Sequence, residues 1–506
     1  MRSYILLLAA GVASIAVLSL SACGAGLYSP LFDASHVPVP DTAIRYVRVG
    51  DTYALSASGA MPPYTYTLTS GPGSVAADGT YTAPSSISGN YETAFIRISD
   101  WWGRSTDVTM YVSVPSTLDT SFGSSSTAIF DIDSGQTVTE VAMQPDGAVL
   151  VGITQDTTSV LVKRVKSDGS GYDLTFGTNG SVSLAVATAL HRIKGLHVDR
   201  WGYIYVAFEW EANTGSGRYW PVVAKLDAGG ALVASYGSGG FASALSSLSI
   251  DGAINPGGFL VDETTGEVYL GGNYYSPTVT YSIFRLTSEG VIDTNWGTGG
   301  RVLAPSESLF WMDDGRLAGC SRYAGGFTAF AGTDWNFAGF AIFDANGALA
   351  VWHHETTVTT DQYPICLSLP DGHVVMAGRG GAGSATFRGR KYTSTTLARD
   401  TTFGTAGVYA SPQAFYETPF NQNLEGLYRI SQQVVYAMTA NVATKRVGYL
   451  GAFDSLGVED ATYSRFLDIG MTGTQIDSTD MGRDGRVILL STLLSENKFA
   501  LTRFWP

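Results

Sequence analysis

Charged residues are scarce in this sequence, and so are histidine and cysteine. Asp, Glu, Lys and Arg make up 15% of the 506 residues, whereas an average soluble protein has about 25%. Carboxylates outnumber cations 44 to 30, so the formal net charge is −14. Nucleic-acid binding requires a basic surface, and this balance therefore argues against a nucleic-acid partner.

Sequence patterns of known catalytic sites are also missing. The chain has no Gly-x-Ser-x-Gly elbow, no His-Glu-x-x-His pair, no phosphate-binding loop and no Asp-x-Asp-x-Asp-Gly calcium loop. His353 and His354 are adjacent rather than two or four residues apart, which disfavours a metal site. We predict no catalytic residue, no metal and no cofactor. A glycosidase is recognised by the separation of two carboxylates, which a sequence does not give, so a carbohydrate-active enzyme stays open as the alternative.

The N-terminus carries a short apolar run. Residues 5–19 follow Arg2 and lead into Leu20-Ser21-Ala22-Cys23. The run is too short and poorly flanked to span a membrane. It resembles the bacterial lipobox, in which small residues precede a cysteine that is acylated and becomes the mature N-terminus; an ordinary signal peptide is the alternative. The resemblance implies a lipoprotein signal peptide over 1–22 and lipidation at Cys23. Gly24 in place of Asp implies the outer membrane, with the acyl chains as the membrane contact.

Glycine, in contrast, is abundant, and much of it belongs to a repeated phrase. The chain has 60 glycines, well above the usual share of about 7%. A phrase that ends in an aromatic residue and glycine returns about every 50 to 60 residues, and such a period with about four strands per copy is typical of β-propeller blades. Its clear copies end at Phe122-Gly123, Phe176-Gly177, Tyr236-Gly237, Trp296-Gly297 and Phe403-Gly404. Degenerate copies around Trp352 and Tyr463 bring the number to seven.

The phrase and the turns between strands resemble the delta-60 repeat family of bacterial propellers. The best turn copies are Gln144-Pro145-Asp146-Gly147 and Leu369-Pro370-Asp371-Gly372, in which Asp-Gly supplies the positive φ of a tight hairpin. The resemblance covers most of residues 116–506 and implies a fold without a settled activity. The repeating aromatic is explained by packing between adjacent blades.

Strand assignment within one period also predicts how the repeat region closes. Strands are expected over 137–143, 148–153, 159–165 and 181–186, and first strands of the seven periods near 138–143, 192–198, 256–261, 307–311, 363–369, 424–430 and 475–480. Residues 128–132 have no first three strands before them, and the strand over 499–504 has no fourth strand after it. Pairing these two segments removes both edges, as closed all-β folds require.

The segment before the repeats divides into two parts. Residues 23–40 carry Gly, Ser and Pro without a periodic pattern and are expected to form a lipidated tether. Residues 41–115 hold short alternating strands, among them Tyr64-Thr65-Tyr66-Thr67-Leu68 and Phe95-Ile96-Arg97-Ile98. Their order resembles the immunoglobulin-like domains of bacterial surface proteins, which are mostly spacers. The predicted fold is therefore all-β, an immunoglobulin-like β-sandwich followed by a seven-bladed β-propeller over 116–506.

Two predictions concern individual residues. Cys320 and Cys366 are expected on strands that are not direct neighbours, so whether they form a disulfide stays open. Ligand binding is expected on the propeller face that carries long loops rich in aromatics, at Trp210, Trp220, Tyr274, Tyr275, Trp335 and Tyr416. We predict an outer-membrane lipoprotein that binds a protein or polysaccharide partner without catalysis, and a glycoside hydrolase or lyase at the propeller mouth is the alternative.

Overall fold

The computed structural model shows a chain whose described regular elements are all strands. It describes residues 37–505 apart from these gaps: 41–43, 89–90, 115–116, 156–158, 186–190, 212–218, 244–250, 263–264, 276–278, 304–327, 335–336, 356–361, 370–372, 381–384, 394–395, 397, 416–423, 431–432, 443–444, 464, 468–473, 484 and 494–495. Across these ranges no helix has the length and apolar character needed to cross a membrane. The chain divides into two compact units, Met1–Val114 and Pro115–Pro506. Cys23 and Cys320 lie outside the described residues.

The first unit contains two main sheets that enclose an apolar core. One has the order β2-β9-β8-β5, in which β2 and β9 run parallel, and the other has the order β3-β7-β6. Alternate residues of β8 and β9, such as Ile96, Ile98, Val108 and Met110, are fully buried between them. The strands are β1 (Val39–Pro40), β2 (Ile44–Arg48), β3 (Thr52–Ala54), β4 (Ala57–Ser58), β5 (Thr65–Ser70), β6 (Ser74–Val75), β7 (Thr80–Thr82), β8 (Tyr91–Ser99) and β9 (Ser105–Ser113).

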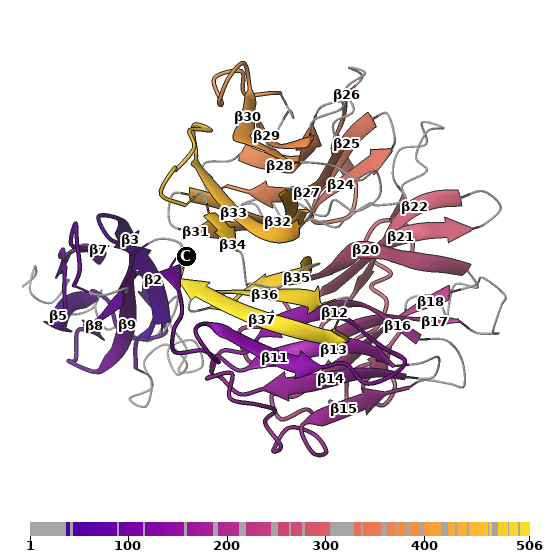
Figure 1. Cartoon of the computed structure of the whole chain (residues 1–506), viewed down its shortest axis with the longest axis horizontal. Coiled ribbons are helices and arrows are strands. Elements are labelled where there is room, and N and C mark those ends of the chain that lie inside the picture. Colours follow the sequence, from indigo (N-terminus) through magenta and orange to yellow (C-terminus); the bar gives the residue numbers. More distant parts are fainter. Residues whose placement is uncertain are drawn as a thin grey trace, which may run out of the picture. The chain divides into compact units, whose positions relative to one another are not determined.

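The second unit is a series of antiparallel sheets, most of them with four strands in chain order (Figure 1). The first three sheets are β12 (Gln136–Met143), β13 (Val149–Gln155), β14 (Ser159–Val165) and β15 (Ser181–Leu184); β16 (His191–Val198), β17 (Ile204–Glu211), β18 (Tyr219–Leu226) and β19 (Phe241–Ala242); and β20 (Asp251–Val261), β21 (Val268–Tyr275), β22 (Val279–Leu286) and β23 (Arg301–Leu303). We name each sheet by its first and last strands.

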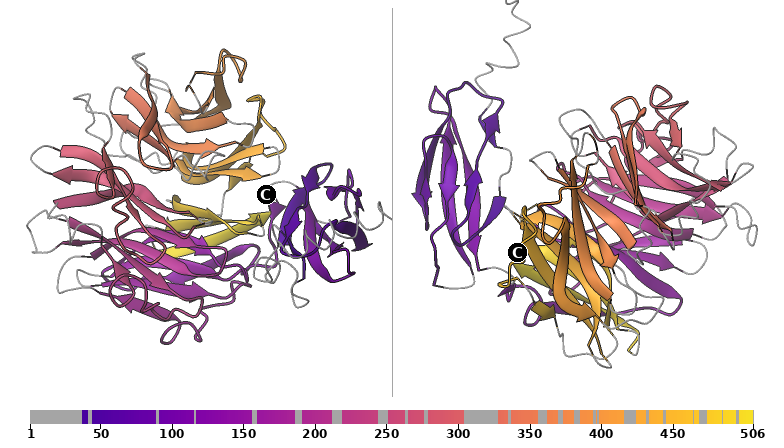
Figure 2. Two further views of the ribbon diagram at one scale, coloured as in Figure 1. Left: turned by 180° about the vertical axis from the view of Figure 1, so that it is seen from behind. Right: turned by 90° about the horizontal axis from the view of Figure 1, so that it is seen from above.

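The remaining sheets follow the same order (Figure 2). They are β24 (Thr328–Asp334), β25 (Phe337–Phe343) and β26 (Leu349–Glu355); β27 (Gln362–Ser368), β28 (His373–Gly380), β29 (Ala385–Thr393) and β30 (Val408–Phe415); β31 (Leu424–Ile430), β32 (Gln433–Val442), β33 (Lys445–Asp454) and β34 (Arg465–Leu467); and β35 (Thr474–Met481), β36 (Val487–Leu493) and β37 (Lys498–Trp505), joined by β10 (Thr117–Leu118) and β11 (Thr127–Asp131).

Successive sheets pack through their first strands. Strand β12 contacts β16, and β16 contacts β20; β24 contacts β27, β27 contacts β31, and β31 contacts β35. Strand β35 of the last sheet in turn contacts β12 of the first. Four-stranded meanders that pack one after another through their first strands are the arrangement of a β-propeller.

The aromatic residue of each repeated phrase is buried between its own sheet and the next. Phe122, Phe176, Tyr236, Trp296 and Phe403 are at most 1% exposed. Phe176, for example, packs with residues of sheet β16–β19, and Phe403 with residues of sheet β31–β34. The packing explanation of the repeat is therefore confirmed for these copies.

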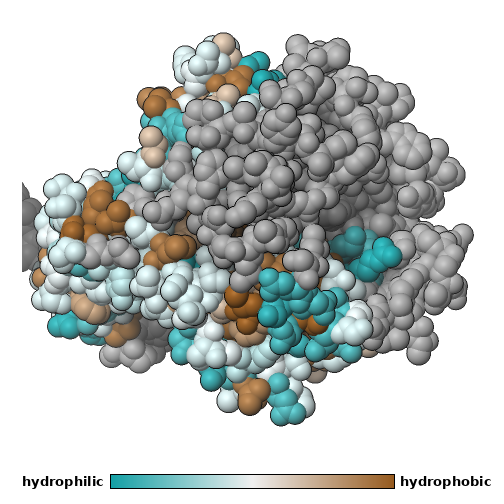
Figure 3. All heavy atoms as spheres, in the orientation of Figure 1, coloured by the Kyte–Doolittle hydropathy of each residue, from teal (hydrophilic) through white to brown (hydrophobic). Residues whose placement is uncertain are grey.

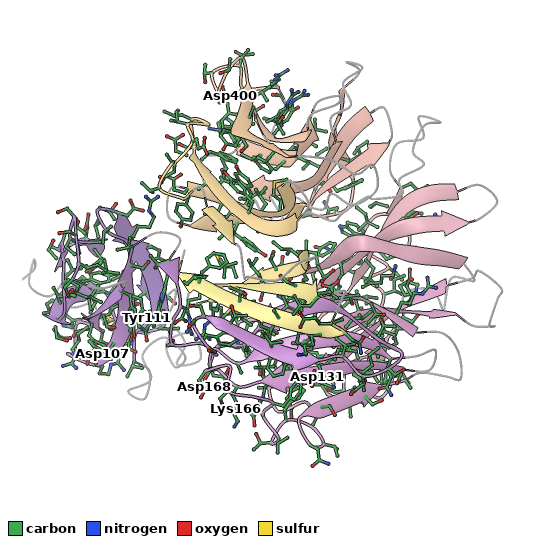
Figure 4. The ribbon with its side chains drawn as sticks, in the orientation of Figure 1. Asp107, Tyr111, Asp131, Lys166, Asp168 and Asp400 are labelled. Carbon is green, nitrogen blue, oxygen red and sulfur yellow. The ribbon has the colours of Figure 1, made fainter. Side chains whose placement is uncertain are left out.

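The glycine of the phrase fastens one sheet to the next by a backbone hydrogen bond. Its N–H donates to a carbonyl in the turn that follows β14, β18, β22, β25 or β33 of the next sheet, at 2.7–2.9 Å: Gly123 to Asp168, Gly177 to Gly229, Gly237 to Glu289, Gly297 to Asn346, and Gly404 to Leu456. We call this bond the latch. Figure 4 labels Asp168 in the first of these turns and Asp400 in the phrase of sheet β27–β30.

Each turn that receives a latch holds a glycine with no room for a side chain. A Cβ on Gly169 would lie 2.7 Å from the Gly123 nitrogen and 3.0 Å from the Phe122 ring. Gly230, Gly290, Gly347 and Gly457 face the next four phrases in the same way. All five adopt positive φ, so glycine is required there twice over, for conformation and for space.

The two degenerate copies differ. Tyr463 is fully buried and packs with Val487 and Phe504 of the last sheet, as a phrase aromatic should. Trp352 instead lies inside β26, opposite Ala341 of β25. The prediction of a phrase at Trp352 was therefore wrong, because β26 follows β25 directly through the short turn over residues 344–348.

The predicted pairing of the two ends of the repeat region is confirmed. Strand β11 pairs with β37, with Ala128 opposite Leu501 and Ile129 opposite Ala500. Asp119 of the first phrase forms an ion pair with Arg503 of β37 at 2.8 Å. Other phrases pair with the third strand of their own sheet in the same way, Asp173 with Arg164 at 2.7 Å and Asp293 with Arg285 at 2.5 Å. The first phrase thus belongs to the last sheet.

Candidate functional site

A cavity of about 590 Å³ opens among the first strands of sheets β12–β15, β16–β19, β20–β23 and β35–β37. We call it the first-strand cavity. Its lining combines polar and apolar groups in about equal measure: Thr137, Thr139, Glu140, Thr154, Arg192, Ile193, Lys194, Gly195, Leu196, His197, Phe259, Leu260, Val261, Asp477, Ser478 and Thr479.

Three of the lining residues lie at β-bulges. The register shifts between Val138 and Glu140, between Ile193 and Gly195, and between Ile476 and Ser478, and these shifts leave Thr139, Lys194 and Asp477 without an opposite residue. A bulge inserts one extra residue, bends the strand and redirects side chains. The same irregularity at the same place in three neighbouring first strands brings a hydroxyl, an ammonium and a carboxylate to one cavity.

Neighbouring groups hold the charged lining residues in place. Lys194 Nζ lies 3.2 Å from Oε2 of Glu209, a β17 carboxylate that is almost completely buried. The backbone N–H of Thr492 donates to Asp477 Oδ2 at 2.7 Å, and the Thr492 hydroxyl donates to the same oxygen. Fixed charges of this kind orient a ligand without reorganising when it binds.

Hydrogen bonds between sheets support the cavity wall. The Val141 N–H donates to Ser478 Oγ at 3.3 Å, and the Met143 N–H donates to Asp480 Oδ2 at 2.7 Å. The Ile193 N–H donates to Thr154 Oγ1 at 3.1 Å. Side chains of one sheet thus satisfy backbone donors of the next near the bulges at Thr139 and Lys194.

Small and aromatic residues set the depth of the cavity. A Cβ on Gly195 would lie 2.5 Å from the Phe259 ring, so the absence of a side chain on β16 admits this ring from β20. The Phe259 ring then supplies an apolar surface beside the polar wall.

A second cavity, of about 570 Å³, lies beside the latch between sheets β27–β30 and β31–β34. Arg388, Tyr409 and Glu459 line it. Burial raises the pKa of the Tyr409 phenol, whose oxygen is 3.2 Å from that of Tyr436. A buried, protonated phenol pair inside an aromatic cluster serves packing, so we take the first-strand cavity as the candidate site.

The structure places the predicted binding aromatics differently from the prediction. Trp210 and Trp220 are opposite each other in β17 and β18, and Tyr274 and Tyr275 lie in β21. They were expected in loops, but the strands extend further because these residues are good strand formers. Their backbones are described and their side chains are not; Trp335 and Tyr416 lie outside the described residues.

Sequence reasoning missed Thr139, Lys194 and Asp477. Each interrupts a strand's apolar–polar alternation, in Val138-Thr139-Glu140-Val141, Ile193-Lys194-Gly195-Leu196 and Ile476-Asp477-Ser478-Thr479. This repeated interruption is the signal that would have indicated the bulges. His197 also lines the cavity. Among the described residues, no three His, Cys, Asp or Glu side chains gather as a metal site would require.

Comparison with known proteins gives similarity in fold only. No family model matches the chain, and no curated protein matches it. A polysaccharide lyase of family PL25, an ulvan lyase bound to -[GlcA(1-4)Rha3S]-, is 9% identical over 74% of this chain and 94% of its own, with a TM-score of 0.41. The β-propeller domain of the trilobed protease from Pyrococcus furiosus is 8% identical over 72% and 96%, with a TM-score of 0.39. The Nup133 β-propeller domain from Vanderwaltozyma polyspora is 6% identical over 74% and 100%, with a TM-score of 0.41.

Proposed function

We propose that this protein is an exported lipoprotein of the outer membrane whose propeller binds a polysaccharide without cleaving it. The observation that carries the binding function is the first-strand cavity, into which bulges bring Thr139, Lys194 and Asp477. The lipid anchor rests on Cys23 and the lipobox pattern around it. Residues 41–115 serve as an immunoglobulin-like spacer, for which the parallel pairing of β2 with β9 is supporting geometry.

The propeller has seven blades in this proposal. Seven sheets follow one another among the described residues of the second unit, and β11 supplies the fourth strand of the last. In a closed propeller the first strands surround the central channel. The first-strand cavity is then part of this channel.

The lining favours a saccharide over a protein segment. Protein interfaces are anchored by buried aromatic and apolar groups, whereas this cavity offers hydroxyls, two carboxylates and two cations beside the half-buried Phe259 ring and four aliphatic side chains. Its volume of about 590 Å³ falls in the usual range of about 300–1,000 Å³ for small-ligand sites. On the face shown in Figure 3, the apolar residues of the described surface are scattered among polar ones.

A glycan array, followed by titration calorimetry on its best ligand, tests the binding function. Lys194→Met and Asp477→Asn are each expected to weaken binding at least tenfold, because each removes a fixed charge from the cavity. Lys163→Met is the matched control, since Lys163 also forms an ion pair, with Asp133 at 3.3 Å, but lies outside the cavity. Unchanged affinity in both cavity variants would contradict the proposal.

A carbohydrate-active enzyme is the second candidate, because Glu140 and Asp477 line the same cavity. Chromatography of the bound glycan after prolonged incubation distinguishes the two functions. Recovery of intact glycan supports binding alone, and shortened products that disappear with Glu140→Gln or Asp477→Asn would establish the enzyme.

The anchor has a separate test. Cys23→Ser is expected to abolish incorporation of a labelled fatty acid, since acylation requires the thiol. Wild-type protein that takes up no label would end this part of the proposal.

A further inference from the structure

The turn Asp199–Tyr203, which joins β16 to β17, is fixed by four hydrogen bonds. The backbone N–H of Asp199 donates to Tyr203 O at 3.0 Å, and that of Gly202 donates to Asp199 O at 3.0 Å. Asp199 Oδ1 accepts from the N–H groups of Trp201 and Tyr203, both at 2.9 Å. Asp199 is buried, whereas Trp201 is 54% exposed. The turn thus holds an indole in solvent on a rigid support.

The corresponding turn of sheet β12–β15 shows what is unusual here. It closes with the same two backbone bonds, Gln144 to Ala148 and Gly147 to Gln144. Asp146 occupies the place of Trp201 and fixes the turn through the Ala148 N–H at 2.9 Å. In sheet β16–β19 the carboxylate that accepts these hydrogen bonds is that of Asp199, two positions earlier. The exposed position therefore needs no aspartate, and it is occupied by Trp201. An exposed tryptophan at a turn tip departs from the local rule, and such departures mark functional sites.

Lys225, near the end of β18, lacks the aspartate ion-pair partner that the equivalent residues of other sheets have. Arg164, Arg285 and Lys391 hold the same place in their sheets and pair with the phrase aspartates Asp173, Asp293 and Asp400 at 2.7, 2.5 and 3.8 Å. The phrase of sheet β16–β19 has Val233 there, whose N–H donates to Lys225 O just as the N–H of Asp173 donates to Arg164 O. Within the described part of the chain, Lys225 Nζ forms no ion pair or hydrogen bond.

The two cations beside this turn lie over aromatic rings. The Arg200 guanidinium is 4.2 Å from the centre of the Trp201 ring. Lys225 Nζ is 4.6 Å from the centre of the half-exposed Tyr203 ring, and 4.8 and 5.6 Å from those of the buried Tyr205 and Tyr236 rings. Arg200, like Lys225, has no carboxylate partner among the described residues, and Tyr203 is 37% exposed. Burial lowers the pKa of Lys225, and the nearby charges of Asp199 and Glu289 offset only part of this effect. A contacting anion would therefore stabilise the ammonium.

We propose that Trp201 and Tyr203, with Arg200 and Lys225, form a second binding site, which takes a hexuronate unit of an acidic polysaccharide. A hexuronate ring presents an apolar C–H face that stacks on a flat aromatic ring and a carboxylate at its edge that a cation can pair with. The external carboxylate takes the role that aspartate has in the sister sheets. The site shares its ligand class with the proposed function, but none of its four residues lines the first-strand cavity.

An acidic saccharide fits this site better than an acidic peptide. Peptides bind grooves or sheet edges that supply several contacts along an extended backbone. Here two exposed rings stand on one short turn, and stacking needs only the rings themselves.

Calorimetry on the full chain with a galacturonate oligosaccharide and its methyl-esterified form tests the proposal. The wild type is expected to bind the acid more tightly than the ester. Trp201→Asp restores the residue of the sister turn and is expected to weaken binding of both forms at least tenfold. Val233→Asp restores the missing internal carboxylate and is expected to remove the preference for the acid, as is Lys225→Met, which serves if Val233→Asp does not fold.

Leu456→Ala is the matched control. Leu456 is an exposed apolar residue at the same position of the turn Asp454–Val458, where Asp454 Oδ1 accepts from Leu456 and Val458 N–H groups at 2.9 Å. This variant is expected to bind as the wild type does. All titrations are repeated in the Lys194→Met background, where the site at Trp201 must still respond even if the cavity does not.

Three results would overturn the proposal. The first is no binding of either galacturonate form, and the second is wild-type affinity in Trp201→Asp. The third is a polyglutamate peptide that binds with the same dependence on Trp201 and Val233, which would assign the site to acidic peptides.

Discussion

Sheet β12–β15 and the last sheet, β35–β37 with β11, use the same pair of charges in different surroundings. In the first, Arg164 and Asp173 stand on one continuous stretch of chain, with side chains 12% and 24% exposed. In the last, Asp119 and Arg503 come from opposite ends of the unit, and their side chains are 1% and 2% exposed. Arg486 adds a second cation to Asp119 at 3.2 Å.

The difference shows where the fold relies on polar contacts. A strand that follows its neighbour through a short turn is held in place by chain connectivity, so its ion pair adds little. Asp119 and Arg503 are 384 residues apart in the sequence, so pairing their segments carries the entropic cost of closing a long loop. There the pair is sealed from water, and Arg503 also donates to the Ser167 carbonyl of the neighbouring sheet at 2.7 Å.

Deletion of residues 116–135 is expected to have the largest effect. It removes β11, Asp119 and Phe122, and leaves β37 as an exposed edge, so aggregation is expected. Gel filtration and thermal unfolding measure the outcome. A monomeric variant that melts like the wild type would show that the last sheet does not need the borrowed strand.

Asp119→Ala and Asp173→Ala compare the two ion pairs directly. We expect Asp119→Ala to lower the free energy of unfolding by about 3–5 kcal/mol, since it leaves a buried arginine without its partner. Asp173→Ala should cost about 1 kcal/mol, because its pair is partly exposed and screened. Chemical denaturation measures both values, and equal costs would refute the distinction.

Low pH should reduce the contribution of the Asp119 ion pair to the free energy of unfolding. Burial alone would raise the pKa of Asp119, but the hydrogen bonds from Ser121 and the charges of Arg503 and Arg486 outweigh it, so the pKa lies below its ordinary value of 3.8. A lowered pKa contributes stability above the unfolded value that is lost as the pH falls through the folded one. The stability gap between wild type and Asp119→Asn should therefore be constant near neutral pH and narrow below about pH 4. A gap that is independent of pH would contradict this.

The latch glycines should show the smallest difference between the two sheets. Gly169 receives the Phe122 phrase of the last sheet, and Gly230 receives the Phe176 phrase of the first; both have positive φ and no space for a Cβ. Alanine at either position is expected to cost about 1–3 kcal/mol. Gly239→Ala is the control: its φ is also positive but nothing lies within 4 Å, so about 1 kcal/mol is expected. A much larger cost at Gly169 would mean that the borrowed strand depends on the latch as well as on the ion pair.

Much of the fold could be predicted from sequence because each repeat is marked by short local patterns of residues. The third strand was expected over residues 159–165, which is where β14 lies. Alternation of apolar and polar residues indicates such strands, and Asp-Gly turns and aromatic–glycine phrases mark the segments between them. The pairing of β11 with β37 followed from counting strands at the two ends. The prediction at Trp352 was wrong because it depended on an aromatic residue near a glycine, without the other residues of the phrase.

The candidate sites could not be predicted because they depend on comparisons across sheets. Lys194 lines the cavity owing to a one-residue bulge, which a periodic pattern averages away. That Lys225 lacks a carboxylate partner becomes clear only when Val233 is aligned with the aspartates at the same position of the other phrases. Trp201 becomes a candidate only through its exposure and its support by Asp199.

The pairing of Thr117 with Trp505 has a topological consequence. These residues face each other on adjacent antiparallel strands, as the two arms of a hairpin do. Their hydrogen bonds join segments 388 residues apart in the sequence, and nothing in the pairing requires that separation. A circularly permuted form of the second unit alone, with a short linker joining these two strands and new termini opened at another hairpin, would keep the sheets of this unit and turn this long-range contact into a local one.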